Sequence, residues 1–171
     1  DMCEILYEKA VTDGNDLVCC GRYNIYSDVD LQDSSKALEV PLEQNFQLKD
    51  RKFELTKISP FPWDKLFKRE IFDKYKFVEN LRFEDLLFIY TVSSQCKSIG
   101  YVSDYLYYYR RSNMSSFLNT FNEATLDLFR SYDHLVSFYK EHGIFEDYKV
   151  EIEYICIRHV FFRFLNMFDP A

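Results

Sequence analysis

The chain has 171 residues, 47% of them hydrophobic and 29% charged, with only four glycines and four prolines, so it has the size and composition of one globular domain. Its net charge of −7 and the absence of any long basic run argue against a nucleic-acid-binding protein. No stretch approaches the ~18 consecutive apolar residues of a membrane span, and the five cysteines lack metal-ligand spacing, a pattern typical of reduced, buried cysteines in a cytoplasmic protein.

The first part of the chain predicts a helix, a strand and a long loop. Apolar residues at helical spacing from Met2 to Ala10 predict a helix that ends at the turn residues 12–15. The apolar run that starts at 16 predicts a strand reaching about Tyr26, and the polar, aperiodic residues 27–50 predict a surface loop. Because the helical pattern is already under way at Asp1, we expect the sequence to be part of a longer chain.

The second part predicts further strands and then only helices. A short helix is expected over 65–75, and a longer apolar helix is expected to follow Phe83-Glu84-Asp85 and to reach Cys96. Two short strands are expected at 98–102 and 105–111, joined by a turn at 103–104. Two antiparallel helices should fill 117–168, the first ending near Gly143. The predicted fold class is therefore α/β with an α-helical C-terminal extension.

Three short motifs stand in order along the chain, and each alone has an ordinary structural explanation. Acidic residues such as Glu84 and Asp85 at a helix start complement the helix dipole. The lysines after Trp63 could lie on a solvated helix face, and the tyrosines before Arg110 could form a half-buried strand. The three motifs together are the residues Trp63-Asp64-Lys65-Leu66-Phe67-Lys68, Arg82-Phe83-Glu84-Asp85 and Leu106-Tyr107-Tyr108-Tyr109-Arg110 with Ser115.

In this order the motifs resemble the C-terminal part of family 2 glycosyltransferases, especially bacterial enzymes that build capsular, exopolysaccharide and lipopolysaccharide chains. The resemblance covers about residues 1–116 and implies an incomplete GT-A fold, the acceptor-side half of an inverting glycosyltransferase domain, with 117–171 as a helical extension. Two features depart from the family. Asp64 replaces its asparagine, and the nucleotide-binding half with its metal-binding D-x-D is absent. The Asp28-Val29-Asp30 triplet lies on the wrong side of the helix and strand that should follow that motif, which favours a polar surface loop.

The resemblance also implies roles for individual residues. Asp85 would be the catalytic base, with Glu84 orienting the acceptor, because direct displacement at the anomeric carbon needs a carboxylate to accept the acceptor's hydroxyl proton. A helix N-terminus would keep Asp85 ionised. The donor diphosphate calls for fixed cations, and Trp63 either stacks on sugar or, as we favour, fills the core. The expected cations are Lys65, Arg110 and Arg111, with Lys68 in reserve.

The implied partners are a nucleotide-diphosphate sugar and a glycan or lipid-linked acceptor. Mg²⁺ or Mn²⁺ is expected for the full enzyme, with its D-x-D ligands outside this chain and no metal bound by this part. His134, His142 and His159 have no partner at metal-ligand spacing, and His159 is expected to be a core histidine with a hydrogen-bond partner.

The alternative is a non-catalytic interaction or scaffold domain that docks through the aromatic helices 117–168. These helices could also contact a membrane surface or a second copy. If the chain is part of a glycosyltransferase, we expect it to act in the cytoplasm, at the inner face of the membrane, and we expect this part alone to be inactive.

Overall fold

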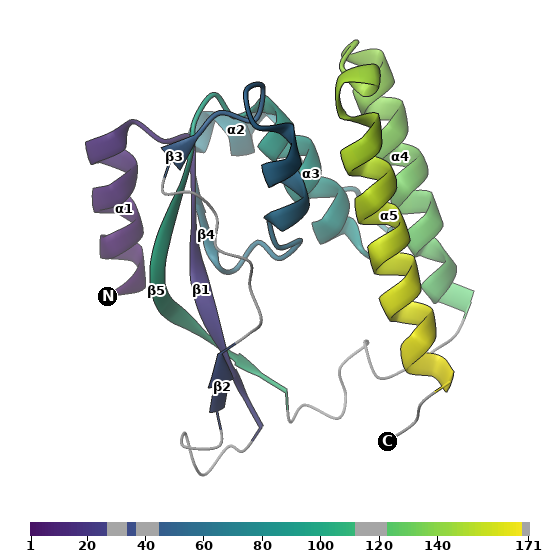
Figure 1. The fold of residues 1–171 in the computed structure, drawn as a ribbon, viewed down its shortest axis with the longest axis horizontal. Coiled ribbons are helices and arrows are strands. Elements are labelled where there is room, and N and C mark those ends of the chain that lie inside the picture. Colours follow the sequence, from purple (N-terminus) through teal and green to yellow (C-terminus); the bar gives the residue numbers. More distant parts are fainter. Residues whose placement is uncertain (27–33, 37–44, 112–122, 169–171) are drawn as a thin grey trace.

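The computed structural model describes residues 1–26, 34–36, 45–111 and 123–168, and for 34–36, 124 and 163–168 only the backbone. One helix, α1, covers one face of a mixed sheet, and all the other larger helices lie on the opposite face (Figure 1). The outermost pair, α4 (Asp127–Glu141) and α5 (Phe145–Phe168), runs antiparallel, as predicted. Strands mixed with helices and followed by a helical pair confirm the α/β class.

Strand β1 (Leu17–Ile25) is the centre of the sheet. It pairs in parallel with β5 (Ile99–Arg110), and its other edge pairs antiparallel with β4 (Lys65–Phe67) and with β2 (Ser34–Lys36). The short β3 (Asn45–Phe46) pairs antiparallel with the start of β5. The β1–β5 register shifts on both sides of Gly21. A Cβ at this position would lie 3.1 Å from the Tyr105 ring, so the close approach of that ring favours glycine.

Helix α1 (Met2–Asp13) packs through a small core of its own. Its first turn is closed by a capping box between Asp1 and Glu4, and it ends at Gly14, which has a left-handed φ of 66°. Leu6 is its buried residue. With Val18 and Cys20 of β1 it forms a cluster separate from the main core.

The main core lies between the other face of the sheet and the remaining helices. Helix α3 (Glu84–Gln95) is buried along most of its length because it packs against the sheet, the short 3₁₀ helix η1 (Lys52–Lys57) and α4. Buried tyrosines tie these layers together, since Tyr139 donates to the Tyr90 carbonyl at 2.9 Å. His159 is a core histidine, as predicted: Nδ1 lies 2.7 Å from the Tyr132 hydroxyl, and burial lowers the pKa of His159 to about 3. Gly143 ends α4 with a φ of 68°.

Two predicted elements are wrong. Residues 65–75 do not form one helix: 65–67 are strand β4, and helix α2 (Arg69–Lys74) begins only afterwards. The open edge of β1 offers hydrogen bonds that this segment takes up, with Lys65 opposite Cys19, and this pairing outweighs the local helical pattern. The turn at 103–104 is also wrong, because β5 continues through both residues and absorbs them as an irregularity opposite Gly21.

The expected loop 27–50 contains the strand residues 34–36 and 45–46, so it is not loop throughout. Asp28 and Asp30 lie outside the described residues, as do Ser115 and the expected boundary between 116 and 117. The cysteines are free, and Cys3 is exposed, contrary to the expectation that all five are buried.

Candidate functional site

The first feature of the candidate site is a buried ion pair between Asp64 and Lys65. The side chains of Asp64 and Lys65 are each only 1% exposed, and Lys65 Nζ donates to Asp64 Oδ1. The other two protons of the ammonium have partners as well, at 2.7 Å from both the Ser59 hydroxyl and the Phe61 carbonyl. Ser59 also donates to Asp64 Oδ2 at 2.7 Å. Because its three donors are engaged inside the protein, Lys65 holds the loop 59–64 in place and does not present its charge to a ligand.

A group of four stacked aromatic rings lies next to this ion pair: Phe61, Trp63, Tyr107 and Tyr109. Trp63 lies nearly parallel to Tyr109, with centroids 5.1 Å apart, and it also stacks on Tyr107 at 4.3 Å and on Phe61 at 4.9 Å. All four rings are half-buried. Trp63 therefore neither fills the core completely nor is fully open to a sugar: it packs against protein rings, and part of its surface remains exposed.

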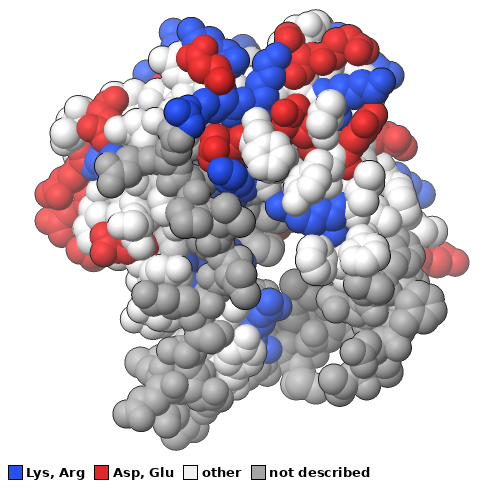
Figure 2. Space-filling model, in the orientation of Figure 1, with Lys and Arg blue, Asp and Glu red and all other residues white. Residues whose placement is uncertain are grey.

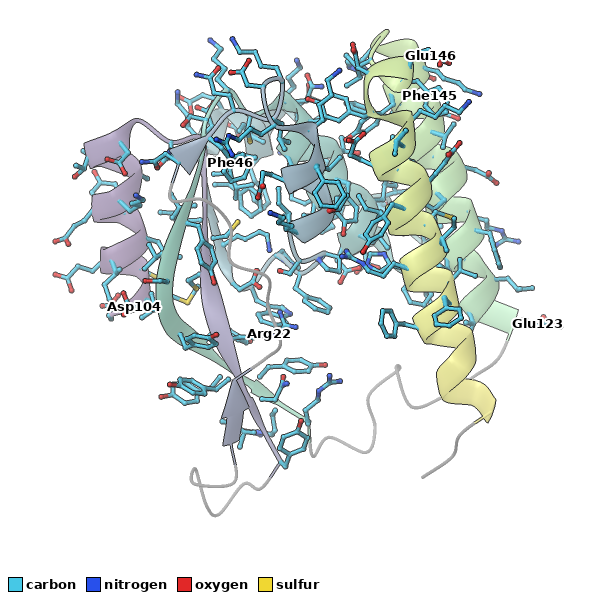
Figure 3. The ribbon with its side chains drawn as sticks, in the orientation of Figure 1. Arg22, Phe46, Asp104, Glu123, Phe145 and Glu146 are labelled. Atoms are coloured by element: carbon cyan, nitrogen blue, oxygen red, sulfur yellow. The ribbon has the colours of Figure 1, made fainter. Side chains whose placement is uncertain are left out.

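Two arginines accompany the aromatic group. Arg22 of β1 lies with its guanidinium 5.0 Å from the Phe61 centroid and 3.7 Å from Asp64 Oδ2. Arg111 lies over Tyr109 at 5.4 Å. Figure 3 shows Arg22 on the side of β1 that faces the helices α3 to α5. Sequence reasoning missed Arg22, although a charged residue inside the apolar run Leu17–Ile25 was a usable signal.

Arg110 differs from Arg111 in its direction. Side chains alternate along a strand, so Arg110 belongs to the face opposite Tyr107 and Tyr109. Of the two predicted arginines, the structure brings Arg111 to the aromatic group and directs Arg110 away from it. Lys68 is exposed and lies 3.5 Å from Asp16, away from this group.

Asp85 lies in the first turn of α3, and its pKa is shifted in the direction opposite to the one that a helix start favours. Burial, its largest influence, raises the pKa of Asp85 to about 6, and the charge of Glu84 adds to the rise. The hydrogen bond from the Leu86 amide, 2.7 Å from Oδ1, acts in the opposite direction, and Lys65 also lowers the pKa slightly. The helix start therefore does not keep this carboxyl at a low pKa, because desolvation outweighs it. A carboxylate with a pKa near 6 suits a general base at neutral pH.

The residue before this helix has an unusual backbone. Phe83 has a φ of 61° and a ψ of 28°, in the left-handed region that bulky residues rarely adopt. Such a conformation costs ~1–3 kcal/mol and persists only where neighbouring structure holds it.

Figure 2 shows a hollow on one face of the molecule, between the sheet and the helical pair, with Lys and Arg side chains among those above it. Trp63, Lys65 and Arg111 are connected through Asp64 and the stacked rings, and the charge of Lys65 acts on Asp85.

Within the described ranges, no three His, Cys, Asp or Glu side chains lie close enough to hold a metal ion. Among those same residues, no helix is both long and apolar enough to pass through a bilayer.

Two bacterial proteins are similar to this chain. "Putative glycosyltransferase EpsH" of Bacillus subtilis (strain 168) is 26% identical over 180 aligned residues, covering 97% of this chain and 49% of EpsH. "Cholesterol galactosyltransferase" of Borreliella burgdorferi is 26% identical over 160, covering 85% of this chain and 43% of that protein. The chain thus spans less than half the length of either relative. No protein-family model matches it. The similarity supports a transferase of the glycosyltransferase class.

Proposed function

We propose that this chain is the acceptor-side, base-carrying part of an inverting glycosyltransferase of family 2 and GT-A fold, one that acts in the cytoplasm in bacterial surface polysaccharide synthesis. The observation that carries the proposal is a half-buried carboxyl at a helix start, Asp85, with its pKa raised to about 6. The stacked aromatic group is only half-buried, so part of its surface is open to hold a sugar ring. The similarity to two glycosyltransferases supports the reaction class.

In the proposed reaction the acceptor hydroxyl attacks the anomeric carbon of a nucleotide-diphosphate sugar. As the new C–O bond forms, the hydroxyl proton passes to a carboxylate oxygen of Asp85, and the bond from the anomeric carbon to the diphosphate oxygen breaks with its electron pair. Arg111, which is exposed and lies over Tyr109, is the cation that we propose for the leaving diphosphate, in place of the enclosed Lys65. Mg²⁺ or Mn²⁺, if used, would be held by a D-x-D motif outside this chain.

The test uses the longer enzyme to which this chain corresponds. Replacing Asp85 by Asn should lower turnover by ~10²–10⁴, because an amide cannot take the proton, while donor binding persists. Replacing Glu84 by Gln should cost less, since an amide keeps part of an orienting role. Equal and mild losses of rate in both variants would mean that the two carboxyls only complement the helix dipole.

A second candidate function is a docking surface on α5, and the exposure of its outer face favours it. Val150, Tyr154, Ile157 and Phe161 are 47–70% exposed and follow one another at intervals of four, three and four residues, the spacing of a two-helix seam. A second copy of this chain that packs its own α5 against the same seam would bury these four apolar side chains.

Analytical ultracentrifugation tests this second candidate. Ile157→Glu should convert a dimer to a monomer, whereas Lys149→Ser, at an exposed polar position of the same helix, should not. A monomeric wild-type chain at about 100 µM, two to three orders of magnitude above typical specific affinities, would reject it.

A further inference from the structure

The segment that precedes Asp85 is held from both sides by helix α4. The backbone N–H of Arg82 donates to Asp127 Oδ2 at 3.3 Å, and the Ser131 hydroxyl donates to the carbonyl of the same residue at 3.0 Å. Asp127 and Ser131 are one helical turn apart, so both side chains point to one place on the α3 side of α4. They bind the two peptide groups that flank the Arg82 Cα.

Both side chains are buried, which makes these hydrogen bonds costly to lose. Ser131 is 0% exposed and Asp127 is 8% exposed. The second carboxylate oxygen of Asp127 is occupied by Arg130 at 2.8 Å, so the orientation of the carboxylate is set from two directions. A buried polar group without a partner is unfavourable, and each of these groups has its partner in the turn before α3 or on its own helix.

The held segment contains a conformation that needs support. Phe83 follows Arg82 directly and has a φ of 61°, and α3 starts at the next residue, with Asp85 in its first turn. Without contacts that hold it, a phenylalanine would leave the left-handed region. Such a change would rotate the start of α3 and alter the position of the Asp85 carboxyl relative to the aromatic side of the sheet.

We propose that Asp127 and Ser131 are positioning residues for Asp85: by fixing the peptide groups of Arg82 they hold Phe83 in its left-handed conformation and so determine where α3 presents its carboxyl. The inference rests on the proposed role of Asp85. It makes the C-terminal helical pair a part of the site, not an appendage to it. The main core supports this view, because Leu128, Tyr132 and Leu135 of α4 belong to the same cluster as Leu86 and Tyr90 of α3.

The experiment measures the pKa of the Asp85 carboxyl by carbon-13 NMR titration of the 171-residue chain. Ser131→Ala should lower that pKa from about 6 to below about 5, because a loosened helix start admits water to the carboxyl. Asp127→Ala should act in the same direction, and Asp127→Asn should largely retain the wild-type value, since an amide oxygen can still accept from Arg82. Ser93→Ala is the matched control: Ser93 is equally buried, lies on α3 itself and has no partner for its hydroxyl, so the Asp85 titration should not change.

A purely structural role for the two residues would lower the melting temperature and leave the Asp85 titration at its wild-type position, and that result would overturn the proposal. Should Asp127→Ala fail to fold, Ser131→Ala and Asp127→Asn still decide the question. The titration does not depend on activity. If it shifts while Asp85→Asn leaves turnover of the longer enzyme intact, positioning stands and the catalytic assignment falls. If Asp85→Asn abolishes turnover and the titration does not move, the reverse holds.

Discussion

Replacing Asp85 by Asn should stabilise this protein at neutral pH, although the same change should remove its proposed activity. The rise in the pKa of Asp85 from 3.8 to about 6 is caused mainly by burial, so the ionised form is less favourable in the folded state than in the unfolded chain. Fully expressed, this difference corresponds to about 3 kcal/mol. Because the side chain is only partly buried, solvent screens part of the effect, and we expect a gain of about 1–2 kcal/mol.

The sign follows from proton binding. Between pH 3.8 and about 6 the folded state holds more protons at Asp85 than the unfolded state does, so the free energy of unfolding falls as the pH rises. The favourable contribution is complete below pH 3.8 and is lost as the pH passes through about 6. The Asn variant lacks this dependence. Its advantage should therefore be complete at pH 7.5 and reduced to about one fifth of its full value at pH 4.

Thermal unfolding at pH 4, 5, 6 and 7.5 provides the assay. A gain of 1–2 kcal/mol should raise the melting temperature by about 2–8 °C at pH 7.5 for a chain of this length. Asp104→Asn, an exposed carboxyl on β5, is the control for the general loss of one negative charge. If the Asp85 variant is less stable than wild type by the same amount at every pH, the carboxylate is a favourable helix-start charge, and our account of its burial is wrong.

Two further substitutions test the surroundings of the site. Lys65→Met should lower the free energy of unfolding by about 3–5 kcal/mol in urea titrations, because the buried Asp64 carboxylate loses its ion-pair partner and keeps only Arg22, at 3.7 Å. A loss below about 1 kcal/mol would mean that Lys65 is solvated and available to a ligand. Gly100→Ala should lower the free energy of unfolding by about 1–3 kcal/mol, since its Cβ would overlap with Asn15 Oδ1. Adding Asn15→Ala to the same chain should recover part of that loss, and the absence of any recovery would refute the clash.

The helices show how far local patterns predict this fold. The helical spacing in 2–13 and 84–95, and the glycine after the first C-terminal helix, predicted three helices whose existence the structure confirms. In each case the information is local, because a helix makes its hydrogen bonds within one segment and its buried face recurs every three or four residues. The place of Glu84 and Asp85 in the first turn of α3 was predictable for the same reason.

Strand assignments and the charge state of the site depended on distant residues. Lys65 became a strand residue because the edge of β1 was open to it, and β5 ran through Ser103 and Asp104 because β1 is irregular at Gly21 opposite them. The enclosure of Lys65, the place of Arg22 over Phe61 and the raised pKa of Asp85 all arise from groups in other segments. The sequence by itself determined where the helices form and where Glu84 and Asp85 lie in the first turn of α3. Only tertiary packing decided which of the motif charges are buried, since desolvation is a property of everything that surrounds a group and not of its neighbours in the chain.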